Sequence, residues 1–138
     1  MSSVDKAIEI AVHAHAGQVD KAGKPYILHP LRLMMKFQNE IEQITAVLHD
    51  VIEDSELSFN DLDKYGFPSS VLKALEYLTK RKDEKYMDFI VRVSSNDLAI
   101  KIKIEDLKDN MDLTRLPSVT DEDLIRVQKY KNAIKILK

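Results

Sequence analysis

The sequence has 138 residues, a length that suits one compact domain. Its 21 basic and 23 acidic residues give a net charge of −2, which argues against a protein built on a strongly basic face for holding nucleic acid. Hydrophobic residues make up 44% of the chain and charged residues 32%, the mixture expected of a folded domain with a core.

Residue types that are rare or absent narrow the fold class and the location. Only 3 glycines and 4 prolines interrupt the chain, which favours long helices over many short strands. The absence of cysteine excludes disulfides and thiolate ligands or nucleophiles. No apolar run approaches the roughly 18 residues of a membrane span, and the first residues lack the apolar stretch of a secretory signal. We therefore expect one cytoplasmic domain over residues 1–138 that binds neither nucleic acid nor a membrane.

Between the glycines and prolines, apolar residues recur with the spacing of a helix. The first stripe, Val4–Val12, ends before Gly17, and Pro30 stands in the first turn of the second helix. Ser58 is placed to cap a short helix that Gly66 closes. The sequence predicts helices over residues 4–12, 30–37, 41–52, 59–65, 71–78, 86–93, 100–111 and 124–137.

The segment around residues 100–104 fits two structures. Ile100, Ile102 and Ile104 alternate with lysines, as they would in a strand. A helix is the better interpretation, because Leu107 continues the helical spacing and a single strand would have no partner. Thr120 resembles a cap for the last helix, whose inner side is expected to carry Leu124, Val127, Ala133, Ile134 and Leu137. The predicted fold is an all-α bundle.

A group of ionisable residues interrupts the apolar stripe of the helix predicted over 41–52, in His49-Asp50-Val51-Ile52-Glu53-Asp54. Helical geometry would place Glu53 beside His49 and Asp54 beside Asp50. Imidazole and carboxylate together form an ordinary ligand set for Mn²⁺, Fe²⁺ or Zn²⁺. A solvated acidic face is the plainer interpretation, but the flanking apolar residues should point inward. Buried ionisable groups need partners or a metal.

Two residues elsewhere in the chain are also candidates for binding a metal. His29 precedes Pro30 at a predicted helix start, a position where a histidine is more often a cap or core residue than a ligand. Asp106 lies between apolar residues of the 100–111 helix, with Asn110 one turn later.

Taken together, the motifs resemble those of a known family. A His, an adjacent His-Asp pair and a distant Asp form the pattern of the HD superfamily of metal-dependent phosphohydrolases. The closer likeness is to the hydrolase domain of the RelA/SpoT proteins and to the small alarmone hydrolases, and it extends from Ala7 to Tyr130. The motifs that carry it, in order, are His15-Ala16-Gly17-Gln18, Gly23-Lys24-Pro25-Tyr26-Ile27-Leu28-His29-Pro30, His49-Asp50-Val51-Ile52-Glu53-Asp54, Leu78-Thr79-Lys80, and Lys103-Ile104-Glu105-Asp106 with Asn110-Met111.

The resemblance implies an HD-domain helical bundle and an enzyme that removes the 3′-diphosphate of (p)ppGpp or a close analogue. It implies one divalent ion, usually Mn²⁺ in this family, with the ligands His29, His49, Asp50 and Asp106. The pair that acts on the attacking water corresponds to Glu53 and Asp54. Residues that hold the nucleotide correspond to Lys21, Tyr26, Asn110 and Tyr130.

Two departures from the family pattern bear on the substrate. Asp20 stands where the family usually has a basic residue, and Lys108-Asp109 replaces the usual Leu-His or Leu-Tyr before Asn110. We expect neither to affect the metal site, and both to bear on substrate identity. An HD phosphohydrolase for another nucleoside phosphate and a catalytically idle nucleotide-binding module are the alternatives. Retention of Glu53 and Asp54 argues against the idle module. Whether the chain forms a homo-oligomer is left open.

Overall fold

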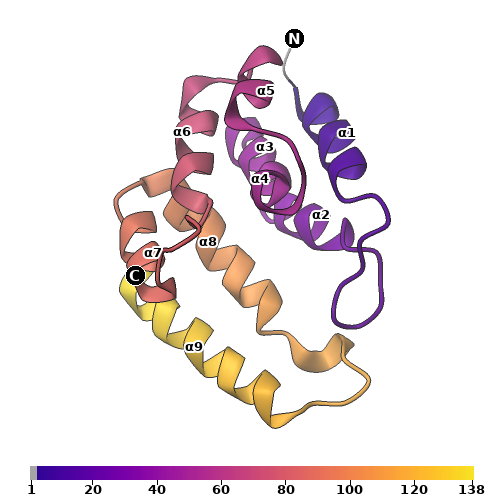
Figure 1. Ribbon diagram of the computed structural model, residues 1–138, viewed down its shortest axis with the longest axis vertical. Coiled ribbons are helices and arrows are strands. Elements are labelled where there is room, and N and C mark those ends of the chain that lie inside the picture. The colour runs from indigo at the N-terminus through magenta and orange to yellow at the C-terminus, as the bar shows by residue number, and fades with distance from the viewer. Residues whose placement is uncertain (1–2) are drawn as a thin grey trace.

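The computed structural model describes residues 3–138, which form an all-helical bundle (Figure 1). Over this range there is no β-strand, and a single β-bridge joins Val19 to Pro25. The all-α prediction is confirmed. The elements are α1 (Val4–Ala14), α2 (Leu28–Met34), α3 (Glu40–Leu48), α4 (Val51–Asp54), α5 (Phe59–Lys64), α6 (Ser69–Leu78), α7 (Tyr86–Val93), α8 (Asp97–Asn110), the 3₁₀ helix η1 (Leu113–Arg115) and α9 (Asp121–Leu137).

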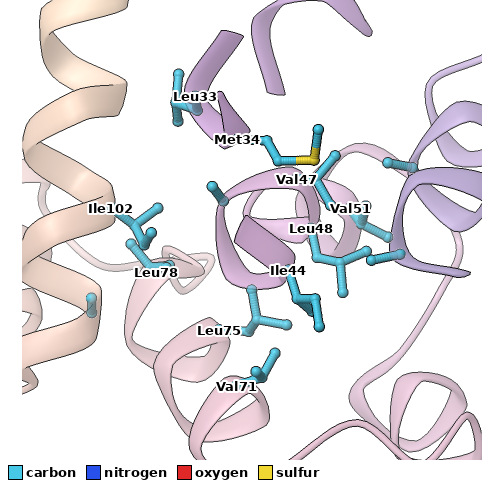
Figure 2. Close-up of a cluster of buried hydrophobic side chains, with 14 of the residues drawn as sticks. Leu33, Met34, Ile44, Val47, Leu48, Val51, Val71, Leu75, Leu78 and Ile102 are labelled. Atoms are coloured by element: carbon cyan, nitrogen blue, oxygen red, sulfur yellow. The ribbon is translucent and has the colours of Figure 1, made fainter. Parts of the chain in front are cut away.

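Helix α3 is the central element of the bundle. It packs against α1, α2, α6 and α8, while α9 covers α7 and α8. Figure 2 shows apolar side chains arranged around α3, among them Leu33 of α2, Leu75 of α6 and Ile102 of α8, all of which are buried. Such close packing holds the neighbouring helices at fixed positions, which a site assembled from several of them requires.

Local sequence signals define several helix ends. Ser58 and Asp61 form a capping box at the start of α5, and Thr120 and Asp123 form another at the start of α9. Gly66 closes α5 with a φ of +80°, a conformation that costs glycine little. The segment around 100–104 lies within α8, so the helical interpretation is confirmed.

The helix predicted over 41–52 is wrong in one respect, because it is broken. Helix α3 ends at Leu48 and α4 begins at Val51. Between them His49 keeps helical angles, whereas Asp50 adopts φ −106° and ψ 0°. Neighbouring side chains on a regular helix diverge by about 100°. The break instead brings the His49 and Asp50 side chains together, with His49 Nε2 2.9 Å from Asp50 Oδ2.

Two smaller expectations also differ from the structure. Helix α2 ends at Met34, so the predicted continuation to Phe37 is not helical, although Phe37 still packs against the core. Leu124 was expected on the inner side of α9, but its side chain is 55% exposed. The buried residue in this turn is its neighbour Asp123, which forms the capping box with Thr120.

The contrast between Leu48 and Leu124 leads to a stability prediction. Leu48→Ala should lower the free energy of unfolding by about 2–5 kcal/mol, because a fully buried side chain leaves a cavity. Leu124→Ala deletes the same atoms from an exposed position and should stay within about 0.5 kcal/mol of wild type. Urea denaturation of the metal-free protein measures both, and equal losses would contradict the burial described for this bundle.

Candidate metal centre

Four side chains from three parts of the chain meet between α2, α3 and α8. Their ligand-type atoms all lie within 4.8 Å of one another, in the cluster His29, His49, Asp50 and Asp106. His29 belongs to α2, His49 and Asp50 form the turn between α3 and α4, and Asp106 belongs to α8. Except for Asp50, which is partly exposed, these residues are buried. The structure thus brings together the four residues that the resemblance assigned to a metal.

The orientation of His49 leaves one ring nitrogen facing carboxylates. Its Nδ1 donates to the carbonyl of Ala46 at 2.7 Å, since a carbonyl can only accept. Nε2 then lies 2.9 Å from Asp50 Oδ2 and 3.4 Å from Asp106 Oδ1, but makes no hydrogen bond of acceptable geometry within residues 3–138. Burial lowers the pKa of His49, yet the two carboxylates more than offset this and raise that pKa well above its ordinary value.

His29 is arranged in the same way. Its Nδ1 lies 2.6 Å from Asp109 Oδ2, and its Nε2 lies 2.9 Å from Asp106 Oδ1 and 3.8 Å from Asp50 Oδ2. Burial lowers the pKa of His29, but hydrogen bonds to Asp106 and Asp109 outweigh it and the net shift is upward. Each histidine therefore directs one nitrogen away from the cluster and the other into it.

The two carboxylates are held ionised in the metal-free protein. Burial raises the pKa of Asp50, but His49 lowers it more strongly, to about 2. Burial likewise raises the pKa of Asp106, and Lys103 and His49 bring it well below its usual range. Lys103 Nζ lies 2.8 Å from Asp106 Oδ2.

This donor set fits a divalent cation. Two imidazole nitrogens and two carboxylates converge on one point, and the buried Nε2 of His49 has no hydrogen-bond partner among the described residues. A nitrogen lone pair facing carboxylate oxygens is stabilised by a proton or by a metal ion. Mixed nitrogen and oxygen ligands suit the first-row divalent metals.

Glu53 and Asp54, the residues predicted to act on water, lie on α4 next to the cluster. Glu53 is exposed, and its Oε1 accepts a hydrogen bond from the backbone amide of Lys80 at 2.6 Å. Burial raises the pKa of Glu53, and burial together with the charge of Asp50 raises that of Asp54 to about 6. Their catalytic role stays a prediction.

A cavity of about 360 Å³ adjoins the cluster at His29. Its size falls within the range typical of small-molecule sites. The four residues predicted to hold the nucleotide all line it: Lys21, Tyr26, Asn110 and Tyr130. The Tyr26 hydroxyl donates to Asp50 and Asn110 Nδ2 donates to Asp106 Oδ1 at 3.0 Å, so these two residues also hold candidate metal ligands.

Asp20 lines the same cavity, in the loop between α1 and α2. Its Oδ1 accepts hydrogen bonds from the backbone amides of Ala22 and Lys24, both at 2.9 Å. Asp20 therefore stabilises the turn that carries Lys21, in addition to placing a negative charge beside the cavity.

Sequence reasoning missed the roles of four residues around the cluster. Lys103 contacts Asp106 and Asp109 contacts His29, while Arg32 and Arg115 contact Asp109. The departure from the family pattern at Asp109 was expected to bear on the substrate and not on the metal site. The structure places Asp109 in contact with His29, and Arg32 pairs with it through two nitrogens. The available signal was its spacing from Asp106, because residues three apart share a helix face.

Comparisons with known proteins found relatives in sequence and in fold. No family model matches the chain. The guanosine-3′,5′-bis(diphosphate) 3′-pyrophosphohydrolase of Aquifex aeolicus is 30% identical over 120 residues, which cover 78% of this chain and 17% of that protein. The bifunctional (p)ppGpp synthase/hydrolase SpoT of Escherichia coli is 30% identical over 121 residues, covering 77% of this chain and 17% of SpoT. This chain is homologous to a segment of the SpoT-type hydrolases.

A solved structure shares the fold of this chain. A solved structure of a metazoan orthologue of SpoT that hydrolyses ppGpp superposes with a TM-score of 0.83, covering 98% of this chain and 85% of that one at 22% identity. The expected HD-type helical fold is thereby confirmed. The chain spans only about 17% of the length of the curated relatives it matches. Within residues 3–138, no helix is both long and apolar enough to cross a bilayer.

Proposed function

We propose that residues 1–138 form one cytoplasmic hydrolase domain that removes the 3′-diphosphate of (p)ppGpp with the help of Mn²⁺. One observation carries the proposal: a buried His–His–Asp–Asp cluster adjoins, at His29, a cavity lined by basic and aromatic side chains. Homology to SpoT-type proteins supports the substrate class.

The proposed ligands are His29, His49, Asp50 and Asp106. A divalent cation at such a site supplies Lewis-acid chemistry, activating water and polarising a phosphoryl oxygen. In this proposal Glu53 and Asp54 orient the attacking water and take its proton. The hydrogen bond from the Lys80 amide restricts the Glu53 carboxylate, and a positioned carboxylate favours such a role.

The cavity residues would bind the nucleotide. Lys21 offers an ammonium to the phosphates, and Tyr130 offers a ring face to the base or ribose. Tyr26 and Asn110 would act through the ligands they hold, because the hydroxyl of Tyr26 binds Asp50 and the amide of Asn110 binds Asp106.

The test is hydrolysis by purified protein of a panel containing ppGpp, GTP and simpler nucleoside phosphates, with Mn²⁺, Mg²⁺ or Zn²⁺ added. Release of pyrophosphate from ppGpp with Mn²⁺ is the expected result. Stoichiometric metal binding without hydrolysis of any nucleotide would refute the enzyme and favour a binding module.

A less highly charged nucleotide is a second candidate substrate, and the charges around the cavity favour it. Three of the four basic side chains that line the cavity are each paired with a carboxylate: Arg32 with Asp109, Arg115 with Asp112, and Arg126 with Asp123. Among the residues that the structure describes, Lys21 is the lining cation with no carboxylate within 4.0 Å.

A substitution at Asp20 tests this charge effect. A carboxylate about 8 Å from a phosphate costs about 1 kcal/mol per charge at an effective dielectric of about 40. Asp20→Asn should therefore raise kcat/KM for ppGpp about fivefold, mainly through KM. The Asn side-chain oxygen can still accept from Ala22 and Lys24, so the turn is preserved. Asp20→Arg adds a cation but loses both of these hydrogen bonds, so its expected gain is smaller.

Steady-state kinetics at two salt concentrations measures this effect. Asp97→Asn removes an equal charge from the opposite end of α8 from Asp106 and should leave kcat/KM unchanged. A kcat/KM for Asp20→Asn that is unchanged or lower would show that this carboxylate does not oppose substrate binding.

A further inference from the structure

Asp109 forms a charged cluster on the outer side of His29. Its side chain is only 8% exposed. It contacts the imidazole of His29 and the guanidinium groups of Arg32 and Arg115. Arg32 Nε lies 2.9 Å from Asp109 Oδ1 and Arg32 Nη2 lies 2.9 Å from Oδ2, which is a two-point contact. Arg115 Nη2 donates to the Asp109 backbone carbonyl at 2.7 Å and lies 3.5 Å from Oδ2.

The contact between Asp109 and His29 determines which ring nitrogen would keep its proton when a metal ion binds. An ionised carboxylate can only accept, so the 2.6 Å contact requires a proton on His29 Nδ1. Burial raises the pKa of Asp109, but hydrogen bonds from His29 and Arg32 outweigh it and hold that pKa below its usual range. By the same argument Nε2, 2.9 Å from Asp106 Oδ1, carries a proton when no ion is bound. A divalent ion in the cluster would replace that proton and take the Nε2 lone pair, while Nδ1 stays protonated against Asp109.

Arg32 and Arg115 hold the carboxylate of Asp109, and this carboxylate in turn orients the ring of His29. A guanidinium that binds both carboxylate oxygens sets the plane of the carboxylate as well as its position. Arg32 follows His29 by one turn on α2, whereas Asp109 lies on α8 and Arg115 on η1. The cluster therefore ties the α2 ligand to the α8 segment that also carries Asp106.

We propose that Asp109, held by Arg32 and Arg115, is a positioning residue that sets the tautomer and ring orientation of His29 for a divalent ion. The inference rests on the metal site of the proposed function but not on its substrate. In many metal sites such an outer partner of a ligating histidine changes metal affinity by about 10–100-fold.

The first measurement is metal affinity without substrate, from chelator competition with Mn²⁺. Asp109→Ala should weaken binding by about 10–100-fold, and Arg32→Ala should weaken it less, because Arg115 still contacts Asp109. Asp112→Asn is the matched control. It removes a carboxylate that also pairs with Arg115 and lines the same cavity, but makes no contact with His29, so affinity should change less than about threefold.

The second measurement is spectroscopic and would not respond to a purely structural role. In the Zn²⁺-loaded protein, whose ion is diamagnetic, the His29 Nδ1 proton should give a protected, downfield resonance. Asp109→Ala should remove this resonance. The His49 Nδ1 proton, which is hydrogen-bonded to the Ala46 carbonyl, should keep its resonance. Asp109→Asn retains an acceptor oxygen, so it should restore the resonance in part and lose only about 3–10-fold in affinity.

Thermal unfolding of each metal-free variant shows whether it folds. If Asp109→Ala does not fold, the metal affinity and the His29 resonance of Asp109→Asn test the inference instead. Unchanged affinity and an unchanged His29 resonance in the folded variant would overturn the inference. Failure of wild type to bind any metal would instead refute the proposed function, and failure to hydrolyse ppGpp with metal bound would leave this inference standing.

Discussion

Asp50→Asn is expected to abolish stoichiometric binding of the divalent ion while leaving the protein folded. Asp50 and His49 supply half of the four candidate ligands, and Asp50 Oδ2 lies 2.9 Å from His49 Nε2 and 3.8 Å from His29 Nε2. The substitution keeps the size of the side chain but removes its charge. We expect affinity to fall at least about 100-fold, more than the loss of an outer partner causes.

His49→Ala should have the same effect through the loss of a nitrogen ligand. Elemental analysis after mild chelation and reloading with Mn²⁺ measures the stoichiometry, with Asp97→Asn as a charge-matched control on α8. If both ligand variants retain one ion per chain, the metal site is assigned to the wrong residues.

The second large effect is expected from Glu53→Gln, which should lower kcat for ppGpp by about 100-fold or more, the usual contribution of a positioned general base. The glutamine oxygen can still accept the Lys80 amide, so the side chain keeps its anchor and loses only its ability to take a proton. Metal content and KM should be unchanged, because Glu53 is outside the ligand cluster and does not line the cavity.

Single-turnover hydrolysis with Mn²⁺ separates this chemical step from product release. Glu56→Gln is the matched control, since it makes the same change at an exposed residue just beyond α4. Normal turnover by Glu53→Gln would show that the roles assigned to Glu53 and Asp54 are wrong.

Much of the helical architecture is encoded locally, which explains why it could be predicted from the sequence. The apolar spacing within 71–78 and 86–93 matches α6 and α7, and the capping boxes begin α5 and α9 where Ser58 and Thr120 predicted them. These features depend on residues three or four positions apart, so a linear pattern contains them.

The candidate ligands were found by a different route. Helical periodicity alone left His29 open between a cap, a core residue and a ligand, and only the ordered motifs joined it to Asp106, 77 residues away. The convergence of the ligand-type atoms within 4.8 Å follows from how α2, α3 and α8 pack.

Tertiary structure alone decided three features. The turn at His49 and Asp50 replaces a helix that the apolar stripe favoured, because packing on both sides of the turn outweighs the local preference. In the first turn of α9 the buried residue is Asp123, which accepts hydrogen bonds from Thr120 and Arg126, and the neighbouring Leu124 is left exposed. Asp109 contacts His29 across 80 residues of chain, and no local pattern specifies which buried carboxylate meets which imidazole. The residue types and helices are thus properties of the sequence. The distances, partners and protonation of the site arise only when the helices pack and water is excluded, because these quantities depend on groups far apart in the chain.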